Sequence, residues 1–311
     1  MHLCNFTFII PHKNIPSLLQ RCIDSIPQRE DVHIVVVDDN SDSCQVDFSH
    51  FPGLNNPFVE VIFTKEGYGA GYARNVGLKQ VQSKWVLFAD ADDYLPDVDI
   101  FRKYISMAEQ TGADIVVSNY ARLWENRVLP AVKHETFALC SPYSEEFRFR
   151  GFFSVGTLSY VWGKFYRSEF LKKYQIIFGN ISYAEDKLFN MECYICDAKY
   201  VFLEDTGYIY RKNDTSVSWQ YRPDSTQNWF KLANELKGWI EKKNKDPNKY
   251  ASLTRYLIFF AVFFDAKMEY MQHKKSIWAI RKVLKKYGTN PSVNCRTERE
   301  NCSWMRECGK L

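Results

Sequence analysis

The sequence predicts an α/β fold: a mixed, mostly parallel sheet with helices on both faces, followed by a helical C-terminal extension. Two observations predict it. Short apolar runs alternate with helical patterns over the first 120 residues. These runs are apolar throughout, which is typical of strands buried on both faces. The 311 residues, 46% hydrophobic and 25% charged, suit one large or two modest globular domains.

The elements are expected in a simple order along the chain. Apolar runs predict strands at residues 6–10, 32–37, 59–63, 85–89 and 115–119. Helical periodicity predicts helices at residues 15–26, 72–81 and 98–111. Beyond residue 120 the pattern loosens, and residues 125–160 are expected to form strand and loop. Further helices are expected at residues 162–174, 185–196, 226–243 and 250–288.

Charge is divided unevenly along the chain. Residues 1–230 carry 23 Lys and Arg against 29 Asp and Glu, and residues 231–311 carry 18 against 8. Within residues 250–288, the segment 276–287 places apolar residues on one helical face and Lys or Arg on the rest. Such a helix can lie on an anionic membrane or pack on the protein with a solvated basic face. Nucleic acid is not an expected partner, because the larger region is net acidic.

No targeting or membrane-spanning segment is expected. Residues 1–11 resemble a first strand rather than a signal peptide. The longest apolar run, residues 256–264, is shorter than the roughly 20 residues that a spanning helix needs. We therefore expect a cytoplasmic protein, with possible peripheral contact at the inner face of the membrane. The nine cysteines are scattered and odd in number, which indicates reduced thiols, and the pair Cys193 and Cys196 lacks a partner pair at zinc-site spacing.

Polar clusters directly follow three of the predicted strands. Asp38 and Asp39 follow the second, glycines at 67–71 follow the third, and Asp90, Asp92 and Asp93 follow the fourth. Because ligands of open α/β sheets bind outside the carboxyl ends of the strands, these clusters should converge at one edge. Three carboxylates within four residues repel one another unless a cation lies between them, which favours Mg²⁺ or Mn²⁺. A solvated helix N-terminus is the alternative.

The other motifs leave alternatives open. The glycine segment matches a dinucleotide-binding loop only in part, because Tyr72 replaces the third glycine. It can instead deliver Arg74 to a phosphate and Asn75 to a cap or a base. Asp38 and Asp39 can accept from a base or ribose, or close an Asx turn. An acidic pair at residues 185–186 either favours the helix dipole or supplies a general base.

The ordered set of motifs resembles family 2 glycosyltransferases, inverting enzymes of the GT-A fold that build bacterial polysaccharides. The matching segments are FIIPHKN at 8–14, VVVDDNSD at 35–42, GYGAGYARNVGL at 67–78, FADADD at 88–93, WGKFYRSEFL at 162–171, AED at 184–186 and YIYR at 208–211, with Ser216. They cover residues 5–220 in family order. The resemblance implies a GT-A domain at 1–222, with a nucleotide-sugar half (1–120) and an acceptor half (121–222), and an extension at 223–311.

The resemblance also implies roles for single residues. Asp186, with Glu185 beside it, would be the catalytic base. Asp92 would ligate Mg²⁺ or Mn²⁺ across the diphosphate, supported by Asp93. The residues implied to bind the donor, expected to be a UDP-sugar, are Pro11, His12, Asn14, Asp38, Asp39, Arg74, Asp90, Arg211 and Ser216. Trp162, Lys164 and Tyr210 would shape the side of the acceptor, a glycan or lipid-linked oligosaccharide.

One position departs from the family pattern. The first strand of the family often ends Pro-x-Tyr-Asn, whereas this chain has His12 and Lys13 between Pro11 and Asn14. The nucleotide base would then stack on His12 or on a ring from elsewhere, and the choice of UDP over another nucleotide stays open.

Two other functions compete with the transferase. A sugar-nucleotide pyrophosphorylase would need a glycine-rich, basic loop directly after the first strand, which residues 11–14 do not provide. A non-catalytic sugar-nucleotide-binding module would be expected to lack the acidic cluster or the pair at 185–186, and both are present.

Overall fold

The structure is a computed structural model that describes residues 5–96, 100–125, 127–130, 140–142, 144–211 and 225–272, with residues 276, 278, 281–283 and 285. Its strands are β1 (Phe6–His12), β2 (Val32–Asp38), β3 (Val59–Phe63), β4 (Trp85–Phe88), β5 (Ile115–Trp124), β6 (Arg127–Pro130), β7 (Lys164–Arg167) and β8 (Tyr200–Arg211). Its α-helices are α1 (Pro16–Asp24), α2 (Ala70–Leu78), α3 (Ile100–Thr111), α5 (Glu145–Phe149), α6 (Ser168–Tyr174), α7 (Glu185–Ile195), α8 (Ser225–Lys242) and α9 (Pro247–Gln272). Shorter turns are η1 (Phe48–His50), η2 (Arg150–Ser154) and η3 (Thr157–Ser159).

The strands of the described chain form one mixed sheet. Their order is β3-β2-β1-β4-β7-β5-β6, and β8 pairs with β5. Strands β1 to β4 are mutually parallel where they pair, whereas β7 runs antiparallel to both β4 and β5. The parallel half brings the carboxyl ends of β1, β2 and β4 to one edge of the sheet, which positions the candidate site.

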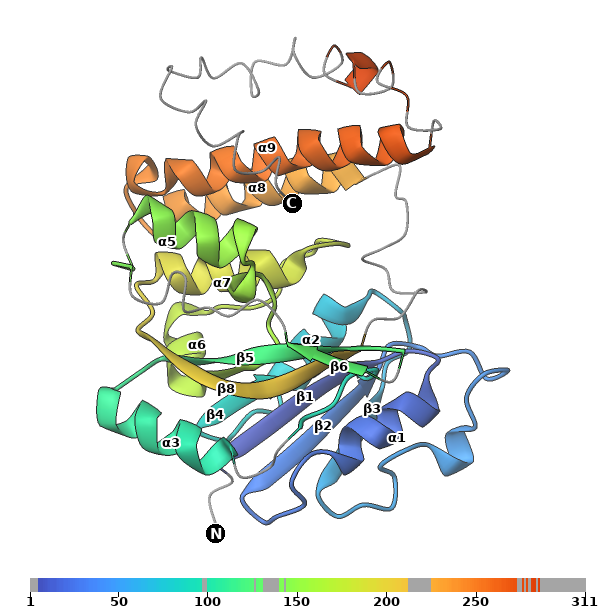
Figure 1. The fold of residues 1–311 in the computed structure, drawn as a ribbon. Coiled ribbons are helices and arrows are strands. Elements are labelled where there is room, and N and C mark those ends of the chain that lie inside the picture. Colours follow the sequence, from blue (N-terminus) through green and yellow to red (C-terminus); the bar gives the residue numbers. More distant parts are fainter. Residues whose placement is uncertain are drawn as a thin grey trace.

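Helices cover both faces of this sheet (Figure 1). On one face, Leu19 and Ile23 of α1 and Phe101 of α3 join Phe6 and Phe8 of β1 in an apolar cluster. The alternate residues of the same strands point to the opposite face, as the pleat of a strand requires. Both faces of β1, β2 and β4 are therefore buried, which explains why these strands are mainly apolar, whereas the edge strand β3 is only half buried.

On the opposite face, α2 packs very closely on β1. A Cβ atom on Gly77 would lie 2.5 Å from Cγ2 of Ile9, so only glycine permits this approach. Gly69, at the N-cap of α2, has φ of 91°, a conformation that L side chains rarely adopt. The two glycines thus fix where α2 begins and how closely it lies to the sheet.

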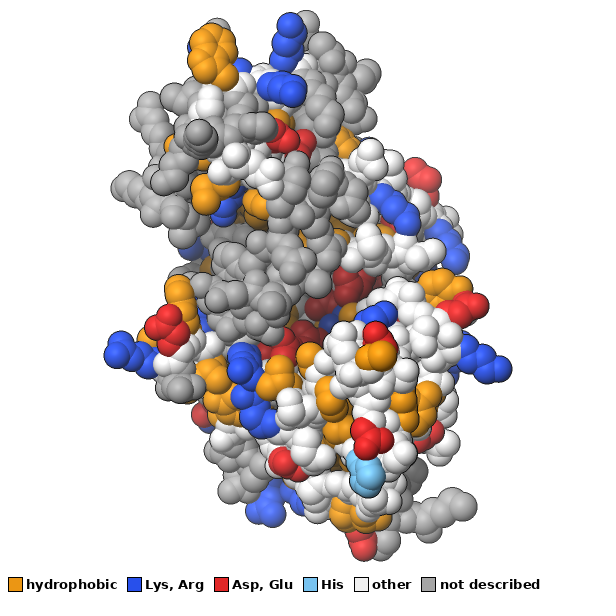
Figure 2. All heavy atoms as spheres, turned by 90° about the vertical axis from the view of Figure 1, so that its right-hand side faces the viewer, with side chains coloured by type: hydrophobic (Ala, Val, Ile, Leu, Met, Phe, Trp, Pro, Cys, Tyr) orange, Lys and Arg blue, Asp and Glu red, His pale blue; other side chains and the backbone are white. Residues whose placement is uncertain are grey.

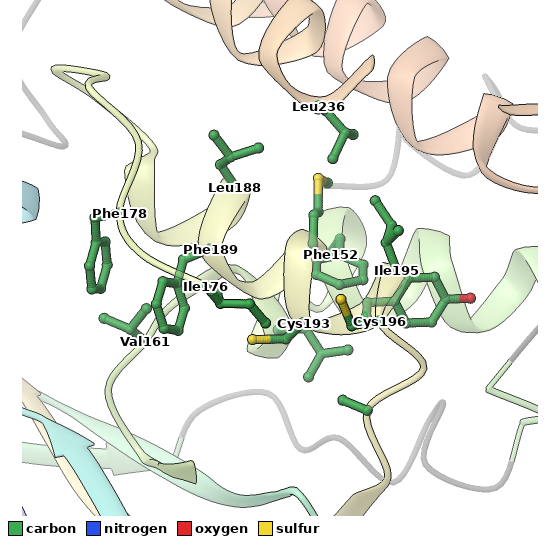
Figure 3. Packing of buried hydrophobic residues seen from close by; sticks show 14 of the residues in the cluster. Phe152, Val161, Ile176, Phe178, Leu188, Phe189, Cys193, Ile195, Cys196 and Leu236 are labelled. Atoms are coloured by element: carbon green, nitrogen blue, oxygen red, sulfur yellow. The ribbon is translucent and has the colours of Figure 1, made fainter. Parts of the chain in front are cut away.

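The C-terminal helices share a core with the sheet. Leu236 of α8 and Leu257 of α9 belong to the same buried cluster as Phe189 of α7 and Phe88 of β4. Figure 3 shows α7 at the centre of this packing, with Leu236 approaching it from α8. The predicted boundary between residues 222 and 223 falls outside the described residues.

Several predicted elements need correction. The helix expected at 162–174 is instead strand β7 followed by α6, because residues 164–167 pair with β4 and β5. The region expected to be strand and loop at 125–160 includes strand β6 but also α5, η2 and η3. Strand β8 was not predicted, and it depends on pairing with β5, far away in the sequence. The fold class, a mixed and mostly parallel sheet with helices on both faces, is confirmed.

Candidate active site

The candidate site lies where β1, β2 and β4 end. His12 is the last residue of β1 and pairs in register with Asp38, the last residue of β2. The acidic segment 90–93 follows β4 directly. Figure 2 shows acidic side chains gathered where this face of the molecule is hollowed. The predicted convergence of the strand ends at one edge is thus present.

Asp38 is a fully engaged buried carboxylate. Its Oδ1 lies 2.7 Å from Nδ1 of His12 and accepts from Oγ of Ser41 at 2.5 Å. Its Oδ2 accepts from the Ser41 backbone N–H at 2.9 Å. Although burial opposes it, these hydrogen bonds hold the pKa of Asp38 below its usual value. Asp38 therefore frames the strand end, and its oxygens face protein donors.

Of the two expected positions for the nucleotide base, stacking on His12 does not fit the burial of this ring, which leaves a ring from elsewhere. The ring is 2% exposed and packs edge-on against Phe51, with centroids 5.1 Å apart. Its Nε2 accepts from the Ile15 backbone N–H at 3.1 Å, which places the proton on Nδ1, facing Asp38. Buried on its faces and bonded at both nitrogens, His12 orients Asp38.

Asp39 holds the glycine-rich loop. Its Oδ1 and Oδ2 accept from the backbone N–H groups of Tyr68 and Gly69, at 3.0 and 2.9 Å. Nζ of Lys13 lies 3.7 Å from Oδ2 and is half exposed. On the neighbouring turn, Oδ1 of Asn14 accepts from the Asp42 backbone N–H at 2.8 Å. Asp39, Lys13 and the loop therefore meet beside the strand end, next to Pro11 of β1.

Arg74 joins segments that are far apart in the sequence. Its guanidinium, 4% exposed, donates to Oδ1 of Asp90 at 2.7 Å through one terminal nitrogen. The other terminal nitrogen donates to Oδ1 of Asp186 at 2.7 Å and to Oε1 of Glu185 at 3.0 Å. These carboxylates raise the pKa of Arg74, although burial opposes them. The arginine thus brings the acidic segment after β4 and the start of α7 into one site.

In the acidic segment after β4, Asp93 is buried and Asp92 is partly exposed. Asp93 is fully buried and accepts from the Tyr208 hydroxyl at 2.8 Å and from the Arg211 backbone N–H at 2.7 Å. Burial raises its pKa well above the usual range. Burial and the neighbouring Asp90 also raise the pKa of Asp92, to about 6. Asp93 therefore fixes the loop to β8, and Asp92 is the better candidate for ligand binding.

The carboxylates of this segment would supply only some of the ligands that a divalent cation needs. In the part of the chain that the structure describes, no three Asp, Glu, His or Cys side chains gather closely enough to hold a metal ion by themselves. Carboxylate oxygens are nevertheless the ligands that Mg²⁺ and Mn²⁺ prefer, and Mg²⁺ is commonly held by one or two carboxylates together with substrate phosphates. Asp92 and Asp90 fit that mode of binding.

Asp186 lies in the first turn of α7, just after a strained residue. Ala184, the N-cap, has φ of 62° and ψ of 25°, a left-handed conformation that is rare outside glycine. Oδ1 of Asp186 faces Arg74, and Oδ2 accepts from the Val161 backbone N–H at 3.3 Å. Its side chain keeps 17% of its surface exposed. Burial, opposed by Arg74, raises the pKa of Asp186 to about 7, in the range of a general base.

Stacked aromatic rings form a wall beside these acids. Trp162 stacks on Tyr160 with centroids 4.5 Å apart and on Tyr208 with centroids 4.7 Å apart. Tyr210 stacks on the same indole at 5.7 Å, and Tyr120 meets it edge-on at 4.8 Å. Tyr160 keeps 37% of its surface exposed, so it presents the open face of the wall.

The remaining predicted site residues have different outcomes. Lys164 does not face the acceptor side: it is 2% exposed, and its ammonium donates to backbone carbonyls inside the core. Arg211 ends β8, and its charge acts on Asp92. Ser216 lies outside the described residues.

The sequence did not predict Phe178 as a contributor to the site, and it did not predict the contacts that Asn75 and Tyr208 make. Phe178 lies under the Arg74 guanidinium, 5.3 Å from its ring centroid to Cζ. Asn75, expected as a cap or a base contact, instead binds the backbone of Phe178 through both its amide oxygen and nitrogen, each at 2.8 Å. The Tyr208 hydroxyl also accepts from the Asp90 backbone N–H at 2.9 Å. The motif at 208–211 includes Tyr208 and so indicated that residue, whereas nothing in the sequence indicated Phe178.

Comparison with known proteins shows which family this chain matches. The model of glycosyl transferase family 2 matches residues 7–175. EpsJ of Bacillus subtilis (strain 168), described as an uncharacterized glycosyltransferase, is 26% identical over 217 residues, which cover 68% of this chain and 62% of EpsJ. TarS of Staphylococcus aureus (strain Mu50), a poly(ribitol-phosphate) beta-N-acetylglucosaminyltransferase, is 25% identical over 268 residues, which cover 83% of this chain and 45% of TarS.

A solved structure resembles the whole fold. The crystal structure of S. aureus TarS residues 1–349 in complex with UDP-GlcNAc has a TM-score of 0.64 and 21% sequence identity, covering 91% of this chain and 80% of that one. The likeness identifies the fold. The chain spans less than two thirds of the length of both curated relatives, EpsJ and TarS.

Proposed function

Since the chain belongs to glycosyl transferase family 2, we propose that it transfers a sugar from a nucleotide-sugar donor by a single inverting displacement with Asp186 as the base. The observation that carries this proposal is the Arg74 contact with both Asp90 and Asp186. It unites the donor-side acid and the base in one site. Attack on one face of the anomeric carbon while the diphosphate leaves from the other inverts the configuration.

Asp186 has the properties that a general base needs. Its pKa of about 7 lies close to neutral pH, where a base combines a large unprotonated fraction with sufficient basicity. The acceptor hydroxyl would lie against its partly exposed carboxylate, beside the wall of Tyr160, Trp162 and Tyr210. As the hydroxyl oxygen forms the new bond, its proton passes to Asp186. Glu185 adds negative charge that favours protonation of its neighbour.

The donor would lie along the strand ends. We propose that Asp39 and Lys13 contact the nucleoside, with Asp38, His12 and Asn14 holding that edge in place. UDP is the favoured nucleotide because the similar TarS structure holds UDP-GlcNAc.

We propose that the negative charge on the leaving diphosphate is stabilised near Asp90 and Asp92. The residues fit a divalent cation, Mg²⁺ or Mn²⁺, held by Asp92 and substrate phosphates. When bound, such an ion stabilises the negative charge that develops on the diphosphate. We propose that Arg211, the last residue of β8, also contacts the diphosphate. The same role is proposed for Ser216.

The acceptor is proposed to be a glycan or a lipid-linked oligosaccharide. The names of relatives support a cell-envelope polymer: TarS is named for poly(ribitol-phosphate), and ExoO of Rhizobium meliloti (strain 1021) for succinoglycan biosynthesis. In the described ranges, no helix is long and apolar enough to cross a membrane. We propose a cytoplasmic enzyme that touches anionic lipid through residues 250–288, where Phe259 and Phe263 are exposed.

The donor can be tested by thermal unfolding. Nucleoside diphosphates and UDP-sugars are added to the protein with and without Mn²⁺, and with an Asp92→Asn variant as the control. A ligand at 100 times its dissociation constant adds about 2.7 kcal/mol to the free energy of unfolding. We expect the largest shift with a uridine nucleotide and Mn²⁺, and a smaller one in the variant. The absence of any nucleotide-dependent shift would contradict the proposal, and release of pyrophosphate from a nucleoside triphosphate and a sugar phosphate would indicate a pyrophosphorylase.

A further inference from the structure

A buried polar network lies behind Asp186, on the side away from Arg74. At its centre is Lys164 of β7, whose Nζ donates to the carbonyl oxygen of Thr157 at 2.7 Å and to that of Tyr160. Both acceptors are uncharged. A lysine is rarely buried without a carboxylate partner, because removing an ammonium from water is costly. This side chain is therefore held where it is by a specific set of contacts.

The contacts of Lys164 are connected to Asp186, the proposed base, through Asn190. The Tyr160 carbonyl also accepts from Nδ2 of Asn190 at 3.1 Å, and the same amide nitrogen donates to the Asp186 carbonyl at 3.0 Å. The Tyr166 hydroxyl donates to Oδ1 of Asn190 at 2.8 Å and so fixes the orientation of the amide. Lys164 and Asn190 thus hold one carbonyl group from two directions.

That carbonyl belongs to the peptide unit whose N–H faces Asp186. The peptide between Tyr160 and Val161 is planar, with its C=O and N–H pointing in opposite directions. Its C=O is held by Lys164 and Asn190, and its N–H donates to Oδ2 of Asp186 at 3.3 Å. Val161 belongs to the same buried apolar cluster as Phe178 and Phe189, and Figure 3 shows the three side chains on one side of α7.

We propose that Lys164 is a positioning residue that orients the Tyr160–Val161 peptide toward Asp186 and, through it, the stacked rings of Tyr160 and Trp162. The inference rests on the proposed role of Asp186 as the base. It gives Lys164 a role in the reaction although its ammonium is buried against backbone carbonyl groups.

The proposal predicts a direction for the pH dependence. The charged and titratable groups that face Asp186 are Arg74 of α2, Asp90 after β4, Glu185 of α7, and Lys164 and Tyr166 of β7. Burial lowers the pKa of Lys164 to about 7, so below that pH its loss removes a cation near the carboxylate. Loss of the peptide orientation weakens the Val161 hydrogen bond. Both changes disfavour the ionised base, so both move the acidic limb of the rate profile to higher pH.

The test compares Lys164→Met with Lys172→Met as the matched control. Lys172 also donates to a backbone carbonyl, that of Val81 at 3.1 Å, but it lies on α6 away from Asp186. In Lys164→Met we expect kcat to fall about tenfold and the acidic limb to rise by about half a pH unit or more, with the donor KM within about twofold of the unmodified enzyme. The control should match the unmodified enzyme in all three. Equal behaviour of the two variants would overturn the proposal, and so would a parallel loss of donor binding in Lys164→Met.

A milder variant keeps the proposal testable if Lys164→Met does not fold. Tyr166→Phe removes only the hydroxyl that orients Asn190, and we expect a smaller fall in kcat with the acidic limb moved in the same direction. An unchanged kcat and profile in Tyr166→Phe would then overturn the proposal. Asp186→Asn is measured beside them: if it transfers sugar at the normal rate, the proposed function fails, whatever the Lys164 variants do.

Discussion

The two acidic regions of the site differ in what surrounds their carboxylates. At the ends of β1 and β2, Asp38 and Asp39 accept hydrogen bonds from a histidine, a hydroxyl and backbone N–H groups. At the ends of β4 and the start of α7, three carboxylates share the single guanidinium of Arg74. The first region is satisfied by hydrogen bonds from the protein, with the half-exposed Lys13 ammonium 3.7 Å from Asp39, and it acts as a frame. The second holds excess negative charge that only a cation or a proton relieves, so it is where chemistry is expected.

Arg74→Met should have the largest effect on stability. The change removes the guanidinium that Asp90, Glu185 and Asp186 share, and breaking a buried ion pair by removing one partner costs about 3–5 kcal/mol. We expect that loss in the free energy of unfolding, measured with urea at pH 8. It should shrink at pH 5.5, because protonation of Asp186 then relieves the repulsion.

The control for that experiment is Arg150→Met. Arg150 pairs with Glu146 at 2.9 Å, but both side chains are more than one third exposed. An exposed pair contributes about 0–1 kcal/mol. If Arg74→Met were no more destabilising than Arg150→Met, the second region would not hold the excess charge assigned to it.

Asp38→Asn should have a smaller effect of a different kind. The amide cannot accept all the hydrogen bonds that the carboxylate accepts, and leaving a buried donor unsatisfied costs about 1–3 kcal/mol. Because Asp38 frames the donor side, we expect a higher donor KM with a nearly unchanged kcat. The steady-state kinetics decide this: a fall in kcat at constant KM would place Asp38 in the chemical step and erase the contrast between the regions.

The pH dependence of stability should sharpen the same contrast. The pKa of Asp38 is lowered on folding, so its contribution to stability is present above about pH 4 and is lost as the pH falls through the folded pKa. The pKa of Asp186 is raised to about 7, so the folded state binds more protons than the unfolded chain between about pH 4 and 7. Stability should therefore decline over that window because of Asp186.

Unfolding free energies of the Asp38→Asn and Asp186→Asn variants, measured from pH 3 upward, separate the two contributions. Asp38→Asn should lose part of the acid sensitivity below pH 4, and Asp186→Asn should lose part of the decline between pH 4 and 7. Slopes of the same sign for both residues would contradict the assignment.

The parallel half of the sheet was predictable because its signals are local. Strands β1, β2 and β4 are buried on both faces, β3 at the edge of the sheet is half buried, and each is recognisable as a mainly apolar run. The sequence predicts a helix where β7 lies, because its four residues become a strand only by pairing with β4 and β5. Strand β8 depends in the same way on β5. Pairing between segments far apart in the chain leaves little trace in either sequence.

The site was predictable to a similar extent. The strand-end rule placed Asp38, Asp39 and Asp90 at one edge, as found. The partners of these side chains were not predictable, because the His12–Asp38 bond and the burial of Lys164 depend on the packing of several segments. Motif position thus predicted which strand ends meet at one edge of the sheet, whereas burial determines which side-chain atoms face the candidate site.

The most direct test of the account is Asp186→Asn, measured for both donor binding and sugar transfer. The asparagine keeps the size of the side chain but cannot take a proton from the acceptor hydroxyl. We expect kcat to fall by about 10²–10⁴ while the dissociation constant of the donor stays within about twofold. Transfer at an undiminished rate would contradict the assignment of the base, and so would a loss of donor binding in proportion to the loss of activity.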